Sequence, residues 1–405
     1  MIIMAISSEY HFSKETIERI SKENSENYLL RNARLKAFEL FEKLPMPDFK
    51  YGLSIKLDVQ DLDISKINLH EHLHRSNIKI KADKKIIVED LNNAITTIPE
   101  VKNQFMRSIV IANKPDAMAA AFWQVGKVIY VPKNTILKEP IVITSDVETN
   151  TLMEYLLVVV ESSCDVSIVE DISSKEKGKH SYSGKLVEVV VKDNSIVHYT
   201  SVQNLSRDFF NFVNKRAVVG ANSTINWLDC CLGTRFTKSD ISTVLKGQGA
   251  VTNNYGIFFG TGSQQFDLRA ATIHAERNTI CDMWTKGALN DRAKTLYSGL
   301  IKINSNAAGS NGYQKEDTLL LSPDAEADSI PELEIDNNEV KCTHGATVGQ
   351  VDKEKLFYLM SRGLPENLAK KQIVTGFFEP MVEKISVEHL KEKLREIVSD
   401  KIEIK

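Results

Sequence analysis

The sequence predicts a mainly β protein, with a parallel β-helix core between two helical regions. Two observations lead to this prediction. Between about Ser108 and Val348, short runs rich in Val and Ile alternate with clusters of Gly, Asn, Asp and Ser, a pattern typical of strands joined by turns. A turn followed by a β-branched residue also recurs at steps of roughly 26 to 30 residues, a period typical of solenoid coils.

The repeat is weak but extends over much of the core. Its β-branched positions are Val166, Ile196, Ile225, Val251 and Ile280. No stretch in this zone has the pattern of a crossover helix, so a β-helix is favoured. A β-sandwich or barrel stays open as an alternative, because many short strands with regular turns fit it too. Sandwich hairpins would favour two-residue turns and shorter spacing.

The N-terminal region, residues 1–105, is expected to be mainly helical. Apolar residues recur at intervals of three and four between Leu29 and Leu44, which is the stripe of an amphipathic helix. Pro45 and Pro47 are expected to end this helix. A less regular stretch follows, with β-like runs such as Lys79 to Val88. The β-helix core is assigned to residues 106–348.

The C-terminal region, residues 349–405, is again predicted to be helical. Asp352 can cap a helix that Gly363 ends, and Pro365 suits the first turn of the next helix. Pro380 is expected to end that second helix, and a last charged helix is predicted from about Val387 to Val398. Short helices after a solenoid either cap its open end or form a docking platform for a partner.

Composition and motifs exclude several classes of function. Lys plus Arg number 51 against 54 Asp plus Glu, and the net charge of -3 gives no general attraction to nucleic acid or membranes. No apolar run is long enough for a spanning helix. The short apolar stretch at the N-terminus is not preceded by a basic region, so a signal peptide is not expected. Five cysteines without CxxC spacing favour a reducing cytoplasm. No standard nucleotide or catalytic signature is present.

Two groups of residues could bind metal. Cys342 and His344 lie two apart in an extended segment, so both point to one side and offer a soft, partial ligand set. The alternative is a buried Cys beside a hydrogen-bonded His. His70, His72 and His74 would share one face of a strand, or else be solvated residues in a polar segment.

The remaining candidates are expected to be packing residues. Cys230 and Cys231 are adjacent and would face opposite sides of a strand, so they cannot easily hold one ion. Cys164 and Cys281 lie near the repeat turns and are interpreted in the same way. For His274 a core position on a coil is favoured.

The segment from Thr318 to Leu364 resembles the C-terminal signature of the SufB/SufD family of iron–sulfur cluster assembly proteins. The elements LLLS, AExD, PxLEI, VxCxHGATVG and FYLxSRG match in order. The resemblance implies a right-handed parallel β-helix with helical flanks. It also implies that SufB and SufD pair through their β-helices, that each binds the ATPase SufC, and that clusters are built at the interface.

The chain departs from the SufB pattern at two positions, and the resemblance is therefore to the SufD branch. Where SufB members carry Cys in a Gln-Cys-Asp segment, this chain has Gln314, Lys315 and Glu316, and where SufB has Glu after the matching His, it has Gly345. The resemblance therefore implies a non-catalytic SufD-type scaffold. His344 is the first candidate ligand of a transient interfacial iron–sulfur cluster, and Cys342, as a ligand or a structural residue, is the second.

The resemblance also implies the partners. SufC is expected to dock on the C-terminal helices, and SufB or a second copy of this chain on the β-helix. No nucleotide site is expected in this chain, and whether a flavin binds the complex stays open. The residues expected to contact SufC are Leu356, Phe357, Tyr358, Ser361, Arg362, Gly363, Phe377 and Phe378.

Two other functions remain as alternatives. The first is a SufB-like homodimeric scaffold that itself receives the nascent cluster. The second is a β-helix carbohydrate-active enzyme. Such an enzyme needs a carboxylate or basic cluster on an exposed sheet face and usually a secretion signal, and neither is evident in the sequence.

Overall fold

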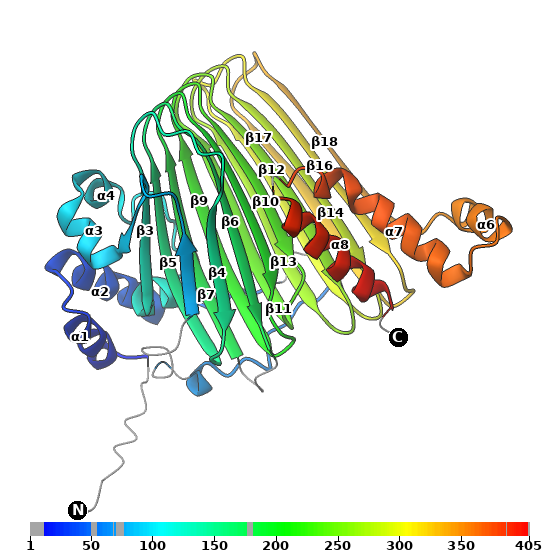
Figure 1. The fold of residues 1–405 in the computed structure, drawn as a ribbon, viewed down its shortest axis with the longest axis horizontal. Helices are drawn as coiled ribbons and strands as arrows, with labels where there is room; N and C mark the ends of the chain where they lie inside the picture. Colours follow the sequence, from blue (N-terminus) through cyan, green and yellow to red (C-terminus); the bar gives the residue numbers. More distant parts are fainter. Residues whose placement is uncertain are drawn as a thin grey trace, which may run out of the picture.

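The chain winds into a solenoid whose strands alternate between two sheets (Figure 1). This arrangement is seen in a computed structural model that describes residues 12–49, 55–67, 69, 77–175, 181–385 and 387–403. Within these residues each sheet contains nine strands. From β3 onward, consecutive strands belong to opposite sheets, so each coil contributes one strand to each sheet.

The strands follow one another regularly along the solenoid. The first sheet consists, in order, of β1 (Asn77–Lys81), β4 (Ile141–Val147), β6 (Asp165–Ser174), β8 (Ile196–Asn204), β10 (Thr224–Cys231), β12 (Val251–Gly260), β14 (Ile280–Leu289), β16 (Asn311–Leu320) and β18 (Lys341–Gln350). The second consists of β17 (Glu326–Ile335), β15 (Lys294–Ile303), β13 (Gln265–His274), β11 (Phe236–Leu245), β9 (Phe209–Val219), β7 (Ser181–Val191), β5 (Thr151–Val160), β3 (Val125–Val131) and β2 (Ile87–Asp90).

Neighbouring strands in each sheet are parallel and stacked in register. Val251 pairs with Ile280, for example, and every residue of β12 follows with the same offset. Only the pairs at the N-terminal end, β1 with β4 and β2 with β3, are antiparallel. The predicted parallel β-helix with helical flanks is confirmed. The sandwich and barrel are excluded, because from β3 onward the neighbours in each sheet are parallel and not consecutive in the chain.

The register corrects one detail of the repeat. The five β-branched positions lie near the starts of successive strands of the first sheet. They do not all stack on one another: Ile196, Val251 and Ile280 stack in one column of paired residues, and Val166 and Ile225 stack in the next column. Val166 is fully buried in the lumen, the interior of the solenoid, whereas Ile280 is 45% exposed on the outer face. A shift of one residue reverses the direction of a strand side chain, and the sequence repeat could not distinguish the two columns.

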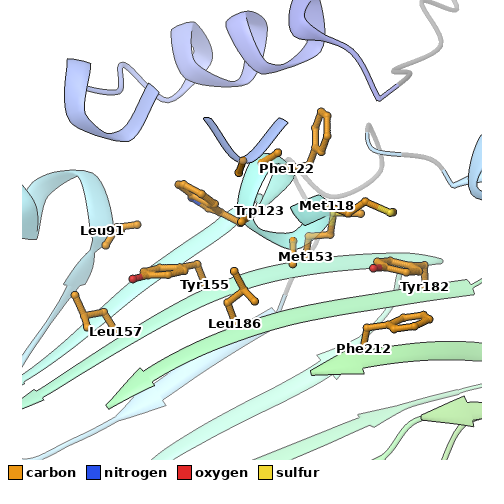
Figure 2. Packing of buried hydrophobic residues seen from close by; sticks show 14 of the residues in the cluster. Leu91, Met118, Phe122, Trp123, Met153, Tyr155, Leu157, Tyr182, Leu186 and Phe212 are labelled. Carbon is orange, nitrogen blue, oxygen red and sulfur yellow. The ribbon is translucent and has the colours of Figure 1, made fainter. Parts of the chain in front are cut away.

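N-terminal helices cover the outer face of the second sheet at the start of the solenoid. They are α1 (Lys14–Glu23), α2 (Tyr28–Lys43), α3 (Leu91–Thr97), α4 (Pro99–Gln104) and α5 (Lys114–Phe122), and a short 3-10 helix lies at Ile64–Lys66. Figure 2 shows Met118, Phe122 and Trp123 above the strands that carry Met153, Tyr155 and Leu186. β5 and β7 are consequently buried on both faces.

Helix α5 lies inside the range 106–348 that the sequence assigned to the β-helix. The first strand with a parallel partner, β3, begins only at Val125. Pro115 to Phe122 are all buried, so the helix has no polar face, and the three- and four-residue periodicity that reveals a surface helix is absent. The Ala-rich sequence therefore gave no amphipathic signal.

The C-terminal helices lie along the outer face of the first sheet (Figure 1). They are α6 (Lys353–Ser361), α7 (Glu366–Val382) and α8 (Glu388–Glu403). α7 packs on β12 and β14, with the rings of Phe378 and Phe259 stacked at 6.0 Å. In α8, Leu390, Leu394 and Val398 form a buried stripe. The helices thus cover the side of the solenoid and do not cap its open end.

Two helix boundaries differ from prediction. Pro380 does not end α7, which continues to Val382. Met381 is fully buried and Val382 is 2% exposed, so packing against the sheet outweighs the hydrogen bond that a proline removes. The last helix extends to Glu403 rather than Val398. No helix among the described residues is long and apolar enough to cross a membrane.

Lys401, near the end of α8, is an ionisable residue that is buried in the folded protein. Its side chain is 7% exposed, and Nζ donates a hydrogen bond to Oε1 of Gln264 at 3.1 Å. Burial lowers the pKa of Lys401 to about 7, and the nearby Arg207 acts in the same direction. The folded protein therefore favours the neutral amine.

This burial predicts a pH-dependent stability. The unfolded chain holds the Lys401 proton up to about pH 10.4, and the folded chain releases it near pH 7. Between these values the unfolded state binds more protons, so stability rises with pH by up to about 1.4 kcal/mol per unit. We expect Lys401→Met to be more stable than wild type at pH 7 and to show a flatter profile from pH 7 to 10. The urea midpoint of unfolding measures both effects. Lys355→Met, at an exposed lysine, is the control, and a profile of the Lys401 variant parallel to wild type would contradict the prediction.

Candidate functional site

The C-terminal end of the solenoid is open. Among the described residues, β17 and β18 each pair with a strand on one side only, and Figure 1 shows them at the end opposite α1 to α4. Ile335 and Val348, at inward-facing positions, are 42% and 40% exposed. A solenoid end of this kind presents apolar surface and a row of unpaired N–H and C=O groups to another chain.

Cys342 lies near the start of β18 and faces into the lumen. It pairs with Gly312 of β16, and a Cβ on Gly312 would lie 3.2 Å from the Cys342 Sγ. Burial raises the pKa of the half-buried Cys342 thiol, so the protonated form is favoured at neutral pH. Gly312 in turn pairs with Cys281, whose Sγ lies 3.3 Å from Nε2 of the buried His274.

His344 lies two residues further along β18 and on the same side as Cys342. It pairs with Gln314 of β16 and is exposed, because no further coil covers it. Cys342 and His344 are therefore together at the open end, with the thiol turned toward the core and the imidazole accessible. Within the described residues no three His, Cys, Asp or Glu side chains form a group suited to a metal ion.

The two positions at which the sequence departs from the resembling motifs, Lys315 and Gly345, are direct neighbours. Lys315 pairs with Gly345, and both face outward. The Lys315 Nζ forms an ion pair with Asp317 at 2.9 Å, and nothing lies within 4 Å of a Cβ placed on Gly345. Sequence reasoning noted both residues but could not show that they pair with each other, next along the strands to the His344–Gln314 pair and on the opposite face of the sheet.

Sequence reasoning missed a buried polar pair beneath β18. Gln314 and Glu316 face the lumen and are 1% and 2% exposed. One oxygen of Glu316 accepts a hydrogen bond from Thr318, and the other has no partner. Burial raises the pKa of Glu316 to about 7. The signal was present in the sequence, because Gln314, Glu316 and Thr318 alternate on one face of the strand where a core face should be apolar.

The predicted docking residues divide into exposed and buried sets. α6 has no buried residue among those described, and Phe357 and Tyr358 are 73% and 57% exposed. Phe377 is half-buried, whereas Phe378 is 1% exposed and belongs to the core beneath α7. Phe378 therefore supports the surface from below and is not accessible to a partner, which corrects its assignment as a contact residue.

A groove separates α6 and α7 from the edge of the first sheet. It has a volume of about 730 Å³, and its walls include Leu319, Tyr358, Leu359, Ile373 and Phe377. Exposed apolar patches next to a groove are typical of protein-binding sites. This groove and the adjacent exposed face of α6, which carries Phe357, form a candidate docking surface, referred to below as the C-terminal docking surface.

The remaining candidates lie in the core or outside the described residues. Cys164, Cys230, Cys231 and Cys281 are buried, as is His274. Cys230 packs beneath the C-terminal helices and Cys231 packs in the lumen, so the two neighbours face opposite sides as expected. His70, His72 and His74 lie outside the described residues.

Comparisons with known proteins agree with this architecture. Residues 142–377 match the family described as SUF system FeS cluster assembly, SufBD core domain. An iron–sulfur cluster assembly SufBD family protein of Staphylococcus epidermidis is 30% identical, over 96% of this chain and 92% of its own length. A relative from Staphylococcus saprophyticus is 29% identical over the same shares.

The open β-helix and its helical flanks thus belong to a known class of assembly protein. The chain is a member of the SufBD family of iron–sulfur cluster assembly proteins. The match covers nearly the full length of these relatives.

The burial of the cysteines predicts their reactivity. Of the five, all within the described residues, only Cys342 is not buried. We expect N-ethylmaleimide to modify Cys342 first in the native protein, and more slowly than a free thiol, because burial raises its pKa and thiolates are the reactive form. Mass spectrometry of tryptic peptides measures the order. Cys342→Ser is the control and should remain unmodified over the same time. Faster labelling of Cys164 would contradict the prediction.

Proposed function

We propose that this chain is a SufD-type scaffold subunit of the Suf iron–sulfur cluster assembly complex. It pairs through the open end of its β-helix with SufB, docks SufC on its C-terminal docking surface, and contributes His344 to a cluster site at the interface. It performs no catalysis of its own. The cluster is cargo, assembled transiently and passed on.

The arrangement of β16 and β18 at the open end is the observation that carries this proposal. His344 is accessible there on the lumen side of β18, and the next pair along the strands, on the outer face, is Lys315 and Gly345, which supply neither a thiolate nor a carboxylate. A cluster at this edge needs ligands from a second chain. By resemblance, SufB carries Cys and Glu at the two corresponding positions, so the two subunits would be complementary.

The docking surface supports the second half of the proposal. Phe357 and Tyr358 are large, aromatic and exposed on a helix that contacts α7 and leaves most of its surface free. Aromatic residues of this kind often dominate the free energy of protein–protein binding. In the resembling family, the matching FYLxSRG segment belongs to the region that binds SufC.

The C-terminal docking surface is connected to the open end of the solenoid through contacts between α7 and the first sheet. The main-chain oxygen of Phe377 on α7 accepts a hydrogen bond from Lys286 of β14 at 2.7 Å, and Phe378 stacks on Phe259 of β12. β14 is the neighbour of β16, which carries Lys315 and pairs with β18. A force applied to α6 and α7 by SufC would therefore reach the strands at the open end.

The first prediction concerns docking. We expect Phe357→Ala with Tyr358→Ala to weaken SufC binding by roughly 30-fold, the effect of losing about 2 kcal/mol at a central contact. Biolayer interferometry with purified SufC measures the affinity. Ile136→Ala, at a side chain that is 72% exposed in another part of the chain, is the matched control. Wild-type affinity in the double variant would move the docking site elsewhere, and failure of the wild-type chain to bind SufC would refute the SufD-type role.

The second prediction concerns the transmission of force. In the assembled complex with SufB and SufC, ATP should change amide hydrogen exchange in β16 and β18 and leave β5 and β7 unchanged. The latter strands are buried beneath the N-terminal helices and serve as the internal control. Unchanged exchange in β16 and β18 would exclude an ATP-driven movement of this edge.

A further inference from the structure

A row of polar residues runs through the otherwise apolar lumen. This row is one inward-facing column of the first sheet, in which each residue pairs with the next. Its six residues are Glu170, Ser201, Asp229, Gly256, Thr285 and Glu316. Burying a carboxylate in such a lumen is costly unless it is paired with a cation or binds a metal ion. The partners of each acid in this row are therefore informative.

Two acids of the row have lysine partners. Glu170 forms an ion pair with Lys185, which also pairs with Glu154 of β5 at 3.0 Å. Asp229 forms an ion pair with Lys215 at 2.6 Å. These lysines reach across the lumen from the second sheet, where β7 and β9 carry them. Each acid is thus matched by a cation of the same chain.

Glu316 is the exception. Its neighbours among the described residues are the neutral hydroxyls of Thr318 and Ser329, and one carboxylate oxygen has no hydrogen-bond partner. No lysine reaches Glu316 from the described strands of the second sheet. On β15 and β17, the column of Lys185 continues with Tyr297 and Ser329, and the column of Lys215 continues with Gly299 and Pro331. The cation that balances the other acids is missing at this position.

A second unpaired oxygen lies two residues away on the same strand face. The Gln314 side chain lies against Gly299, where a Cβ would come within 2.3 Å of the Gln314 Nε2, and its Oε1 has no partner. His344 pairs with Gln314 on the last coil, and Ala346, which pairs with Glu316, adds only a methyl group. The imidazole is the exposed member of this set.

We propose that Glu316 and Gln314 bind a divalent transition-metal ion at the open end of the lumen, with His344 as a third ligand from the last coil. One carboxylate oxygen, one amide oxygen and one imidazole nitrogen form a ligand set suited to Fe²⁺, Mn²⁺ or Zn²⁺. Water or a partner chain completes the coordination. The ion supplies the positive charge that Lys185 and Lys215 supply to the other acids.

This inference deepens the proposed function and depends on it only for the identity of the physiological ion. In a scaffold of iron–sulfur assembly, Fe²⁺ is the ion to be expected, and the site would hold iron next to the edge at which a cluster is built. Two other states of Glu316 compete with the proposal. The carboxyl could stay neutral, or a cationic side chain of a partner could enter the open end.

The test uses the isolated full-length chain, stripped of metal with EDTA, at pH 7.5. Mn²⁺ is the probe, and the fall in the EPR signal of free Mn²⁺ measures binding. We expect one tight Mn²⁺ per chain, and affinity at least about 10-fold lower in Glu316→Gln, which keeps the shape of the side chain. Gln314→Met and His344→Ala should each weaken binding as well. Glu334→Gln is the matched control, because Glu334 is an exposed β17 carboxylate paired with Lys302.

A thermal shift gives a second readout that is independent of EPR. Mn²⁺ should raise the Tm of wild type and of Glu334→Gln, and leave that of Glu316→Gln unchanged, because a ligand stabilises only the state that binds it. Wild-type Mn²⁺ affinity in Glu316→Gln, or no binding by wild type, would overturn the proposal. The SufC affinity of the same preparations separates this outcome from failure of the proposed function, since docking uses α6 and α7.

Discussion

The in-register stacking of coils is the constraint on which the rest of this structure depends. Each inward side chain is buried only because the next coil places another side chain over it at the same position of the strand. Phe258 illustrates how tightly this column packing is adjusted. Its ring lies over Gly287, where a Cβ would come within 1.8 Å of the ring, so glycine is required in the neighbouring coil.

The same constraint leaves surface uncovered at the last coil. No described strand follows β17 and β18 in either sheet, so their inward residues and one edge of each strand are left uncovered in the part of the chain that the structure describes. At the other end, helices and the antiparallel strands β1 and β2 cover the first coil. The C-terminal helices could have served as a cap, but they pack along the side of the solenoid instead. An assembly protein can use an end of this kind as an interface.

Charged groups are buried in the lumen where ion pairs stabilise them. Burial disfavours the charged form of Lys185, but Glu154 and Glu170 outweigh this effect and raise its pKa. Burial also opposes ionisation of Asp229, and Lys215 reverses that and lowers the Asp229 pKa. Such networks are acceptable in an interior when each member has a partner. Glu316 departs from this pattern on β16, one strand before the open end of the first sheet.

The sequence by itself determined the class of fold and pointed to a candidate site. Strand and turn composition, the coil-length repeat, the caps at Asp352 and Gly363, and the motif around Cys342 and His344 are local features, and local features are readable in one chain. Tertiary structure decided what depends on contacts between distant segments. It paired Lys315 with Gly345, buried Phe378 beneath α7, extended α7 past Pro380, and placed Glu316 in the lumen without a cation. Burial and pairing are set by neighbours roughly one coil away, and a strand shows in its own sequence neither which face is inward nor what will lie above it.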